Sequence, residues 1–250
     1  MSIAGVGTNY YSQIASGTRI QSAADGASES AIIEKMRAQT NGYDVGTRNA
    51  EDGKSVLNVA DGAMSGIADQ LQQIRELAVQ ASNTAVLSDS DRSAIQDQIN
   101  ELKQGIAETA NYTEFNTKKL LDGSNRNMNI VSGANGEGMS IDTGNATLQA
   151  LGIANFDVTG NFNIQDIDDA LKMVSDTRSS IGAQSNSLDY TIGYNTQTSY
   201  NLTKTMSSME DTDIEKAVSE LNKKQLLQTM RFMMQKKEEE EQRRKSALLF

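Results

Sequence analysis

Paired carboxylates come closest to a catalytic pattern in this sequence. Asp168 and Asp169 are adjacent, and two neighbouring carboxylates can divide the roles of general acid and general base. This pair lies beside the apolar positions of a predicted helix, where acidic side chains commonly face solvent. We therefore interpret both residues as solvated helix positions. An enzymatic function is further disfavoured because the sequence contains no histidine, no cysteine and no glycine-rich phosphate-binding loop.

The residue types that are missing, together with the charge, exclude other classes of function. Without cysteine and histidine the sequence offers no disulfide, no usual zinc site and no histidine-based triad, and we expect no cofactor. The formal net charge of −10 would repel phosphate backbones, so we expect no nucleic-acid partner. No apolar run reaches the roughly 18 residues of a membrane helix. Met1 to Gly7 has no basic stretch before an apolar one, which is unlike a secretory signal peptide.

The elements that position these side chains are predicted to be long helices. An apolar seam recurs at alternating spacings of three and four, which keeps it on one side of a helix. Its members are Leu57, Ala60, Met64, Ile67, Leu71, Ile74, Ala78 and Ala81. The opposite side is polar, so this helix needs partner helices. The complete absence of proline suits such helices, because proline removes a backbone donor and clashes inside a helix.

The same analysis predicts the remaining elements and the fold class. Apolar repeats predict helices over residues 27–82, 89–111 and 164–209. Asn135-Gly136 separates two alternating runs, which predicts a β-hairpin near 127–143. The predicted fold is mainly α: an elongated antiparallel helical bundle or coiled coil with a small β-hairpin region.

Polar residues and glycines interrupt these helical patterns without ending them. Four polar residues occupy seam positions of the helix predicted over residues 164–209, where such residues fix the register of a coiled coil: Arg178, Ser185, Asn195 and Ser199. Gly42, Gly46 and Gly53 lower helix propensity in the first helix, which we still expect to continue through them.

A further helix with an apolar face is predicted after residue 209. We expect this face to be an assembly interface, formed by Ile214, Val218, Leu221, Leu226, Leu227 and Met230 and continued by Met233 and Met234. Isolated helices without tertiary packing are marginal in water, so we expect the segment to be mobile or loosely helical in the free monomer. The charged run Lys236–Lys245 is interpreted as a solvated helix end in preference to a charged docking site.

Several blocks resemble bacterial flagellin, and they occur in the order found in that family. The blocks are Ser16–Asp25, Gln73–Ala81 (read Gln-Ile-Arg-Glu-Leu-Ala-Val-Gln-Ala), Thr113–Leu121, Val131–Ile141, Asp211–Ile214 and Gln225–Gln228. Together they cover the chain from about Ser16 to Met230. Ordered blocks are more specific than any single motif.

The resemblance implies a structural subunit of the bacterial flagellar filament. Such a subunit is not an enzyme, assembles with copies of itself for motility, and is secreted to the extracellular flagellum without a cleaved signal peptide, with the help of an export chaperone. The resemblance further implies a terminal domain that lines the inner tube, made of residues 1–26 and 210–250. Residues 27–209 would form the rod domain.

The family's rod segment is also what the vertebrate innate flagellin receptor recognises. The positions carried over for receptor or subunit contact are Gln73, Arg75, Glu76, Leu77, Val79, Gln80 and Gln98. Gln73 and Gln98 stand where many receptor-activating members carry Arg and Glu. Both differences remove a charge, so contact with the receptor is expected more than strong activation of it. Both ends of the chain depart from the family: the segment before Ser16 is short, and the end from Arg231 is charged. The alternative is a flagellin-like minor, junction or non-polymerising secreted protein that binds a receptor.

Overall fold

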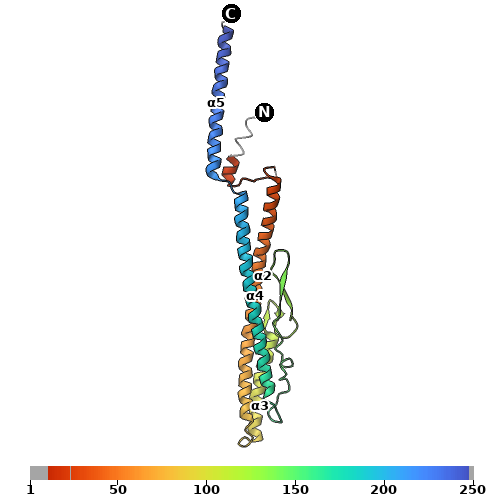
Figure 1. Ribbon diagram of the computed structural model, residues 1–250. Helices are drawn as coiled ribbons and strands as arrows, with labels where there is room; N and C mark the ends of the chain where they lie inside the picture. The colour runs from red at the N-terminus through yellow and green to blue at the C-terminus, as the bar shows by residue number, and fades with distance from the viewer. Residues whose placement is uncertain (1–10, 23, 248–250) are drawn as a thin grey trace. The chain divides into compact units, whose positions relative to one another are not determined.

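The computed structural model describes residues 11–22 and 24–247 and consists mainly of long helices (Figure 1). The helices are α2 (Ala27–Ala81), α3 (Asp89–Tyr112), α4 (Gln165–Glu210) and α5 (Ile214–Ala247). The predicted fold class is confirmed, and the predicted ends of the first three helices are correct to within one residue. The expectations for Met1 to Gly7 lie outside the described residues.

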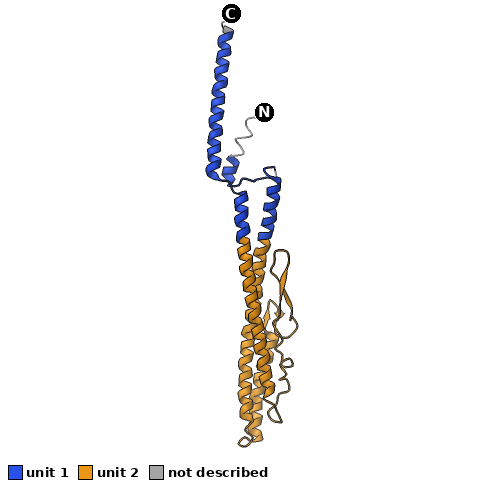
Figure 2. Ribbon diagram, viewed as in Figure 1, with its two compact units in different colours: residues 1–40, 200–250 blue, residues 41–199 orange. Residues whose placement is uncertain are grey.

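The chain divides into two compact units (Figure 2). Unit 2 comprises residues 41–199, and unit 1 comprises residues 1–40 and 200–250. α3 belongs to unit 2 and α5 to unit 1, whereas α2 and α4 contribute residues to both.

The core of unit 2 is the predicted seam. All eight seam residues from Leu57 to Ala81 are at most 1% exposed. They pack with buried residues of α3 and α4: Ile95, Ile99, Ile106, Ile167, Val174, Ile181 and Leu188. A continuous aliphatic seam excludes water along the helices, and burial at roughly 25 cal/mol per Å² of apolar surface is the main stabilising term.

Polar contacts between α2 and α4 show that these helices are antiparallel. Moving forward along α2 is matched by moving backward along α4. The contacts are Asp44 with Ser199 (2.7 Å), Lys54 with Asp189 (2.6 Å), Asp61 with Arg178 (2.9 Å) and Arg75 with Asp168 (2.6 Å). We call these four contacts the α2–α4 ladder. Two of the predicted polar seam positions, Arg178 and Ser199, therefore pair across the helices.

The start of α3 is fixed by a capping box. Ser88 is the N-cap: its hydroxyl accepts a hydrogen bond from Asp91 N, and the Asp91 carboxylate accepts one from Ser88 N. Hydrogen bonds from the Ser88 hydroxyl and then from its backbone hold the pKa of Asp91 below its usual value. These bonds satisfy amide groups that have no partner within the first helical turn.

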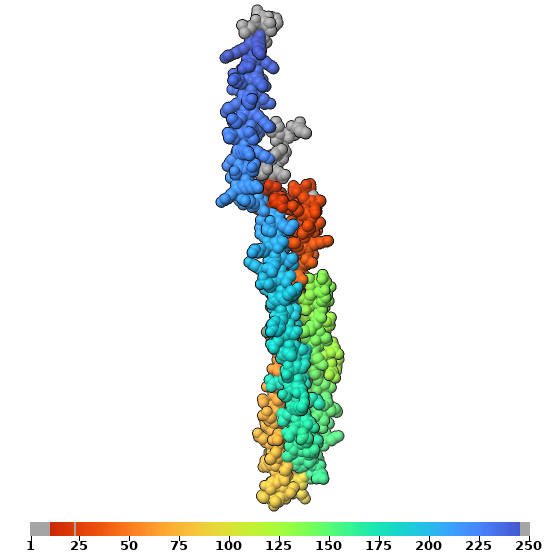
Figure 3. All heavy atoms as spheres, viewed as in Figure 1, coloured from red at the N-terminus to blue at the C-terminus, as the bar shows by residue number. Residues whose placement is uncertain are grey.

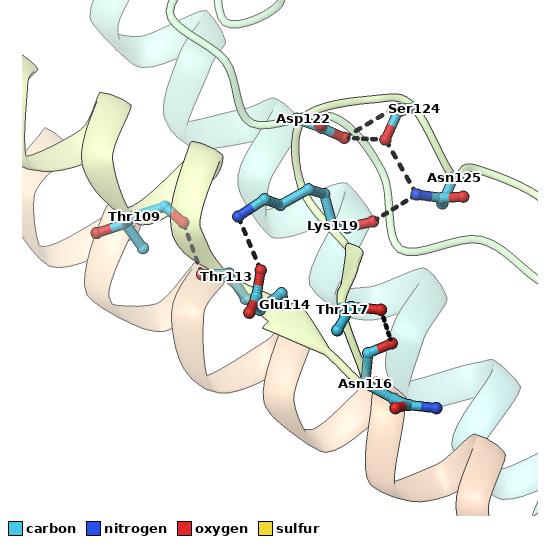
Figure 4. Close-up of polar contacts among 9 residues, drawn as sticks. All are labelled: Thr109, Thr113, Glu114, Asn116, Thr117, Lys119, Asp122, Ser124 and Asn125. Carbon is cyan, nitrogen blue, oxygen red and sulfur yellow. Dashed lines mark hydrogen bonds and ion pairs between the residues drawn. The ribbon is translucent and has the colours of Figure 1, made fainter.

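A two-residue hairpin follows α3 and was absent from the predicted elements. β1 (Glu114–Phe115) pairs antiparallel with β2 (Lys118–Lys119) around Asn116 and Thr117, both with positive φ. Figure 4 shows Lys119 reaching back to Glu114, with Nζ and Oε2 2.9 Å apart. A threonine rarely adopts positive φ because its β-branch crowds the backbone. The turn was not predicted because the sequence lacks the Gly that usually signals it.

The predicted hairpin is confirmed, and it rests on the glycines of α2. β3 (Met128–Val131) pairs antiparallel with β4 (Gly138–Ile141), and Gly136 in the turn has a φ of 90°. A Cβ built at Gly46 would lie 2.1 Å from Ser132 O, so only glycine allows the backbone to approach this closely. Asn195, which is buried, donates its Nδ2 hydrogen to the same carbonyl at 2.7 Å.

The segment between β4 and α4 is held against α3 by side chains of that helix. Lys103 Nζ donates to Ala154 O at 2.9 Å and to Phe156 O at 3.1 Å. Val158 N donates to Gln96 Oε1 at 2.8 Å. These bonds satisfy backbone groups of a segment that lacks regular secondary structure.

Within unit 1, the end of α4 is tied to the first part of α2 and to the residues that precede α2. Arg37 Nη2 lies 3.0 Å from Glu210 Oε2, and Arg19 N donates to Glu210 O at 2.6 Å. α4 continues through Glu210, and α5 begins behind Asp213, whose carboxylate accepts from Lys216 N at 3.0 Å. The further helix predicted to start at Glu210 thus starts at Ile214.

Candidate functional site

Two candidate surfaces bring together residues singled out from the sequence. The first is a groove of ≈ 490 Å³ in unit 2, between α2 and α3, which we call the α2–α3 groove. It is lined by Gln70, Gln73, Glu76, Leu77, Gln80, Gln98, Glu101 and Leu102. Five of the seven predicted contact residues therefore lie together. Three further lining residues were not predicted from the sequence: Gln70, Glu101 and Leu102.

Helical spacing explains why these residues share one groove. Gln73, Glu76, Leu77 and Gln80 recur at spacings of three and four, and so do Gln98, Glu101 and Leu102 on α3. The seam residues between the two rows are buried and hold the helices together. Each groove wall is therefore the polar border of a helix whose apolar stripe forms the core.

The α2–α3 groove is acidic and rich in amides. Glu76 and Glu101 are its charged residues, and no lining residue is basic. Gln70 Oε1 is buried without a hydrogen-bond partner, and a Cβ at Gly105 would lie 2.6 Å from Gln70 Nε2. Gly105 thus leaves room for the Gln70 side chain at the floor of the groove. A hydrogen-bond donor on a partner would fit this chemistry.

Arg75 and Val79, the other two predicted contact residues, do not line the groove. Arg75 Nε donates to Asp168 Oδ1 of α4 at 2.6 Å, and the two side chains are 46% and 36% exposed. This hydrogen bond raises the pKa of Arg75. Asp168, interpreted from the sequence as a solvated helix position, is partly exposed, and its carboxylate is also ion-paired with Arg75. Val79 is exposed.

The second surface consists of the exposed apolar residues of α5 in unit 1, where Ile214 and Val218 fall on one side of the helix and Leu226, Leu227 and Met230 on another. Ile214, Val218, Leu226, Leu227 and Met230 are all exposed, whereas Leu221 is buried. Figure 3 shows the atoms of α5 as the blue spheres near the C-terminal end. Residues 236–245, which follow the apolar stretch, are exposed and mostly charged. Contiguous exposed apolar residues on a helix mark an interaction surface.

Neither a membrane span nor a metal-binding cluster occurs in the described part of the chain. Among residues 11–22 and 24–247, no helix is both long and apolar enough to cross a membrane. Over the same ranges, no group of three or more carboxylates is arranged to hold a metal ion.

Long helices with a buried seam, an acidic groove and an exposed apolar helix face define a helical structural protein that acts through its surfaces. Comparison with protein families gives the particular class. Residues 6–126 match the bacterial flagellin N-terminal helical region, and residues 164–243 match the bacterial flagellin C-terminal helical region. The chain belongs to the bacterial flagellin family.

Individual relatives agree with the family match. The flagellin of Halalkalibacterium halodurans is 38% identical over 222 residues, which cover 86% of this chain and 81% of the relative. The flagellin of Bacillus subtilis is 33% identical over 253 residues, covering 86% and 83%. The crystal structure of Bacillus cereus flagellin aligns with a TM-score of 0.52 and 25% identity, over 59% of this chain and 88% of that chain.

A more distant structure shares the fold alone. The putative flagellar hook-associated protein from Vibrio parahaemolyticus aligns with a TM-score of 0.58 and 16% identity, over 75% of this chain and 100% of that chain.

Membership in the flagellin family identifies this chain as a structural subunit of the bacterial flagellar filament, which is extracellular and self-assembling.

Proposed function

We propose that this filament subunit joins its neighbours through the exposed apolar surface of α5. The carrying observation is that Ile214, Val218, Leu226, Leu227 and Met230 are exposed although they are apolar. Burial of this surface against another copy of the chain would remove apolar groups from water, which drives association. In this proposal residues 1–26 and 210–250 form the assembling terminal domain, and residues 27–209 form the rod domain.

The route to the filament is part of the same proposal. The subunit leaves the cell without a cleaved signal peptide, and a flagellar export chaperone covers the exposed apolar surface of α5 beforehand. A helix with an exposed apolar face is prone to premature association, so a binding partner that masks it keeps the subunit soluble. The subunit acts by assembly and without catalysis.

Assembly of the purified chain tests the role of α5. We expect sedimenting filaments from the unaltered chain and none from Leu227→Glu, because a buried unpaired carboxylate is costly. Val86→Glu is the matched control, since Val86 is also an exposed apolar residue but lies in the turn between α2 and α3. Equal loss of filaments in both variants would contradict the proposal.

Hydrogen exchange provides a second test on the unaltered chain. We expect fast exchange beyond Asp213 in the monomer, slowed by assembly or by the chaperone. Amides near Leu71 and Leu188, which lie in the buried core of unit 2, give the protected reference. Monomer protection beyond Asp213 equal to that reference would mean that α5 is already docked.

Recognition by the vertebrate innate flagellin receptor is proposed for unit 2. The supporting observation is that Gln73, Glu76, Leu77, Gln80 and Gln98 line one groove. Arg75 lies on another face of α2, so a receptor that contacts both would extend across the helix. Receptor binding by the free subunit, measured with the receptor ectodomain, tests this part of the proposal.

A non-polymerising or junction role is the alternative, and one observation favours it. The exposed run Lys236–Lys245 directly follows the apolar face of α5 and would have to be accommodated wherever that face packs. Electron microscopy of sheared appendages separates the two roles. Filaments containing this chain support the filament subunit, whereas a soluble monomer under assembly conditions supports the alternative.

A further inference from the structure

Three methionines of α5 are exposed together on one helix face. Met230, Met233 and Met234 are 56%, 63% and 64% exposed. With Leu226 and Leu227 they occupy positions i, i+1, i+4, i+7 and i+8, which fall on one side of an α-helix. Thioethers therefore make up much of the exposed apolar face between residues 226 and 234.

Other methionines of the chain lie in different surroundings. Met64 is 1% exposed in the core of unit 2, and Met128 and Met139 are partly buried on the β3–β4 hairpin. Met173 on α4 is exposed and belongs to unit 2. The molecule thus contains a protected thioether and an exposed one outside α5, and both serve as internal references.

We propose that Met230, Met233 and Met234 form a reversible oxidation site for two-electron oxidants such as hydrogen peroxide. In the reaction the thioether sulfur attacks one peroxide oxygen, the O–O bond breaks, and an S–O bond forms. Sulfur is oxidised to the sulfoxide, the peroxide is reduced, and water leaves. The substrate class is therefore a small peroxide, and methionine sulfoxide reductases reverse the change.

Oxidation at this site changes the face from apolar to polar. A sulfoxide oxygen accepts hydrogen bonds strongly, so burying it against an apolar partner costs free energy that the thioether does not. Because unoxidised methionine is flexible and polarizable, the same face packs well before oxidation. The inference rests on the proposed assembly role of α5: the oxidised face would no longer support subunit association.

Peptide mass spectrometry of the full chain after limited peroxide treatment tests the modification. We expect the three α5 methionines to be oxidised at least about tenfold faster than Met64, because oxidation follows exposure. Met173 should react at a rate comparable with the α5 residues. Oxidation of Met64 as fast as the α5 methionines would overturn the assignment of a selective site.

Assembly after oxidation tests the consequence. We expect treated wild-type chain to lose filament formation and to regain it after methionine sulfoxide reductase treatment. Peroxide should leave the assembly of the triple variant Met230→Leu, Met233→Leu, Met234→Leu at the level of the same variant before treatment, whereas assembly of Met173→Leu should still be lost on treatment. Equal loss in the treated triple variant would overturn this inference alone. Failure of untreated wild-type chain to assemble would overturn the proposed function and, with it, this inference.

Discussion

The Arg75 Nε atom lies 2.6 Å from Asp168 Oδ1, so the guanidinium of α2 is directed toward α4 and away from the α2–α3 groove. Residues that are close in sequence therefore present different surfaces. A partner that binds the Gln73–Ala81 segment would contact the α2–α3 groove on one side of α2. On the other side it would contact Arg75, which is already paired with the Asp168 carboxylate.

Replacing Arg75 with alanine should weaken receptor binding by at least about 1 kcal/mol, because a planar multi-donor contact is lost. Asp168→Asn is the matched control, since it removes the charge partner but keeps the arginine. Titration with the receptor ectodomain measures both. The melting temperature should change little, because an exposed ion pair contributes at most about 1 kcal/mol. Equal loss of binding in both variants would show that the loss comes from breaking the ion pair between α2 and α4, and not from losing an arginine contact with the receptor.

Gln73→Arg should increase receptor signalling, because it adds a multi-donor cation to the acidic α2–α3 groove. Gln72→Arg adds the same charge at the neighbouring exposed position, which does not line that groove. A cell reporter assay compares the two with the unaltered chain. A similar response to both substitutions would show that net charge, and not the groove, determines signalling.

Replacing Ile181 with aspartate should destabilise unit 2 by about 3–5 kcal/mol, because an uncompensated charge would be buried in the seam. Ile181 is 2% exposed. Ser179→Asp introduces the same charge at an exposed position of α4 and should change the stability by no more than about 0.5 kcal/mol. Denaturant unfolding measures both changes. An unchanged midpoint for Ile181→Asp would contradict the burial of Ile181 in the apolar seam.

Gly46→Ala should destabilise the protein by about 1–3 kcal/mol, although alanine is the better helix former, because its Cβ would collide with Ser132 O. Gly62→Ala on the same helix is the control: nothing lies within 4 Å of its Cβ position, so it should stabilise by about 0.5–1 kcal/mol. Opposite signs in thermal unfolding are expected. The same sign for both would show that the hairpin moves away at little cost.

The capping box should make the stability of α3 pH-dependent. Because the pKa of Asp91 is lowered in the folded state, its contribution is fully present above the unfolded value of roughly 3.9 and disappears as pH falls through the folded pKa. Ser88→Ala should cost about 0.5–2 kcal/mol at pH 7. That cost should shrink in acid, where Asp91 is protonated in both chains. An equal cost at pH 7 and at a pH below the folded pKa of Asp91 would refute the link.

Periodicity was sufficient for the helices but insufficient for the tertiary contacts. The seams depend only on spacing within one helix, so their burial could be predicted. Asn195 was recognisable as a polar seam residue, yet its partner Ser132 lies 63 residues away in sequence, in the connection between β3 and β4. The β1–β2 turn was missed because Asn116 and Thr117 adopt positive φ without a glycine.

The candidate surfaces show the same division. Helical spacing alone separates Gln73, Glu76, Leu77 and Gln80 from Arg75, and this separation could have been made from the sequence. Glu101 and Gln70 were not predictable as groove residues, because the rotation of α3 against α2 decides which of their residues face each other. Such rotations are set by side-chain packing across helices, which spacing within one helix does not encode.

The α2–α4 ladder resolves an ambiguity that the seam leaves open. A seven-residue repeat looks nearly the same after a slide of one repeat, about 10 Å along the helix, so apolar packing alone permits several alignments of similar energy. A slide of that length would separate Asp61 from Arg178 and Lys54 from Asp189. Exposed ion pairs contribute little to total stability. Here, however, they distinguish one alignment of α2 and α4 from other alignments that have nearly the same packing energy.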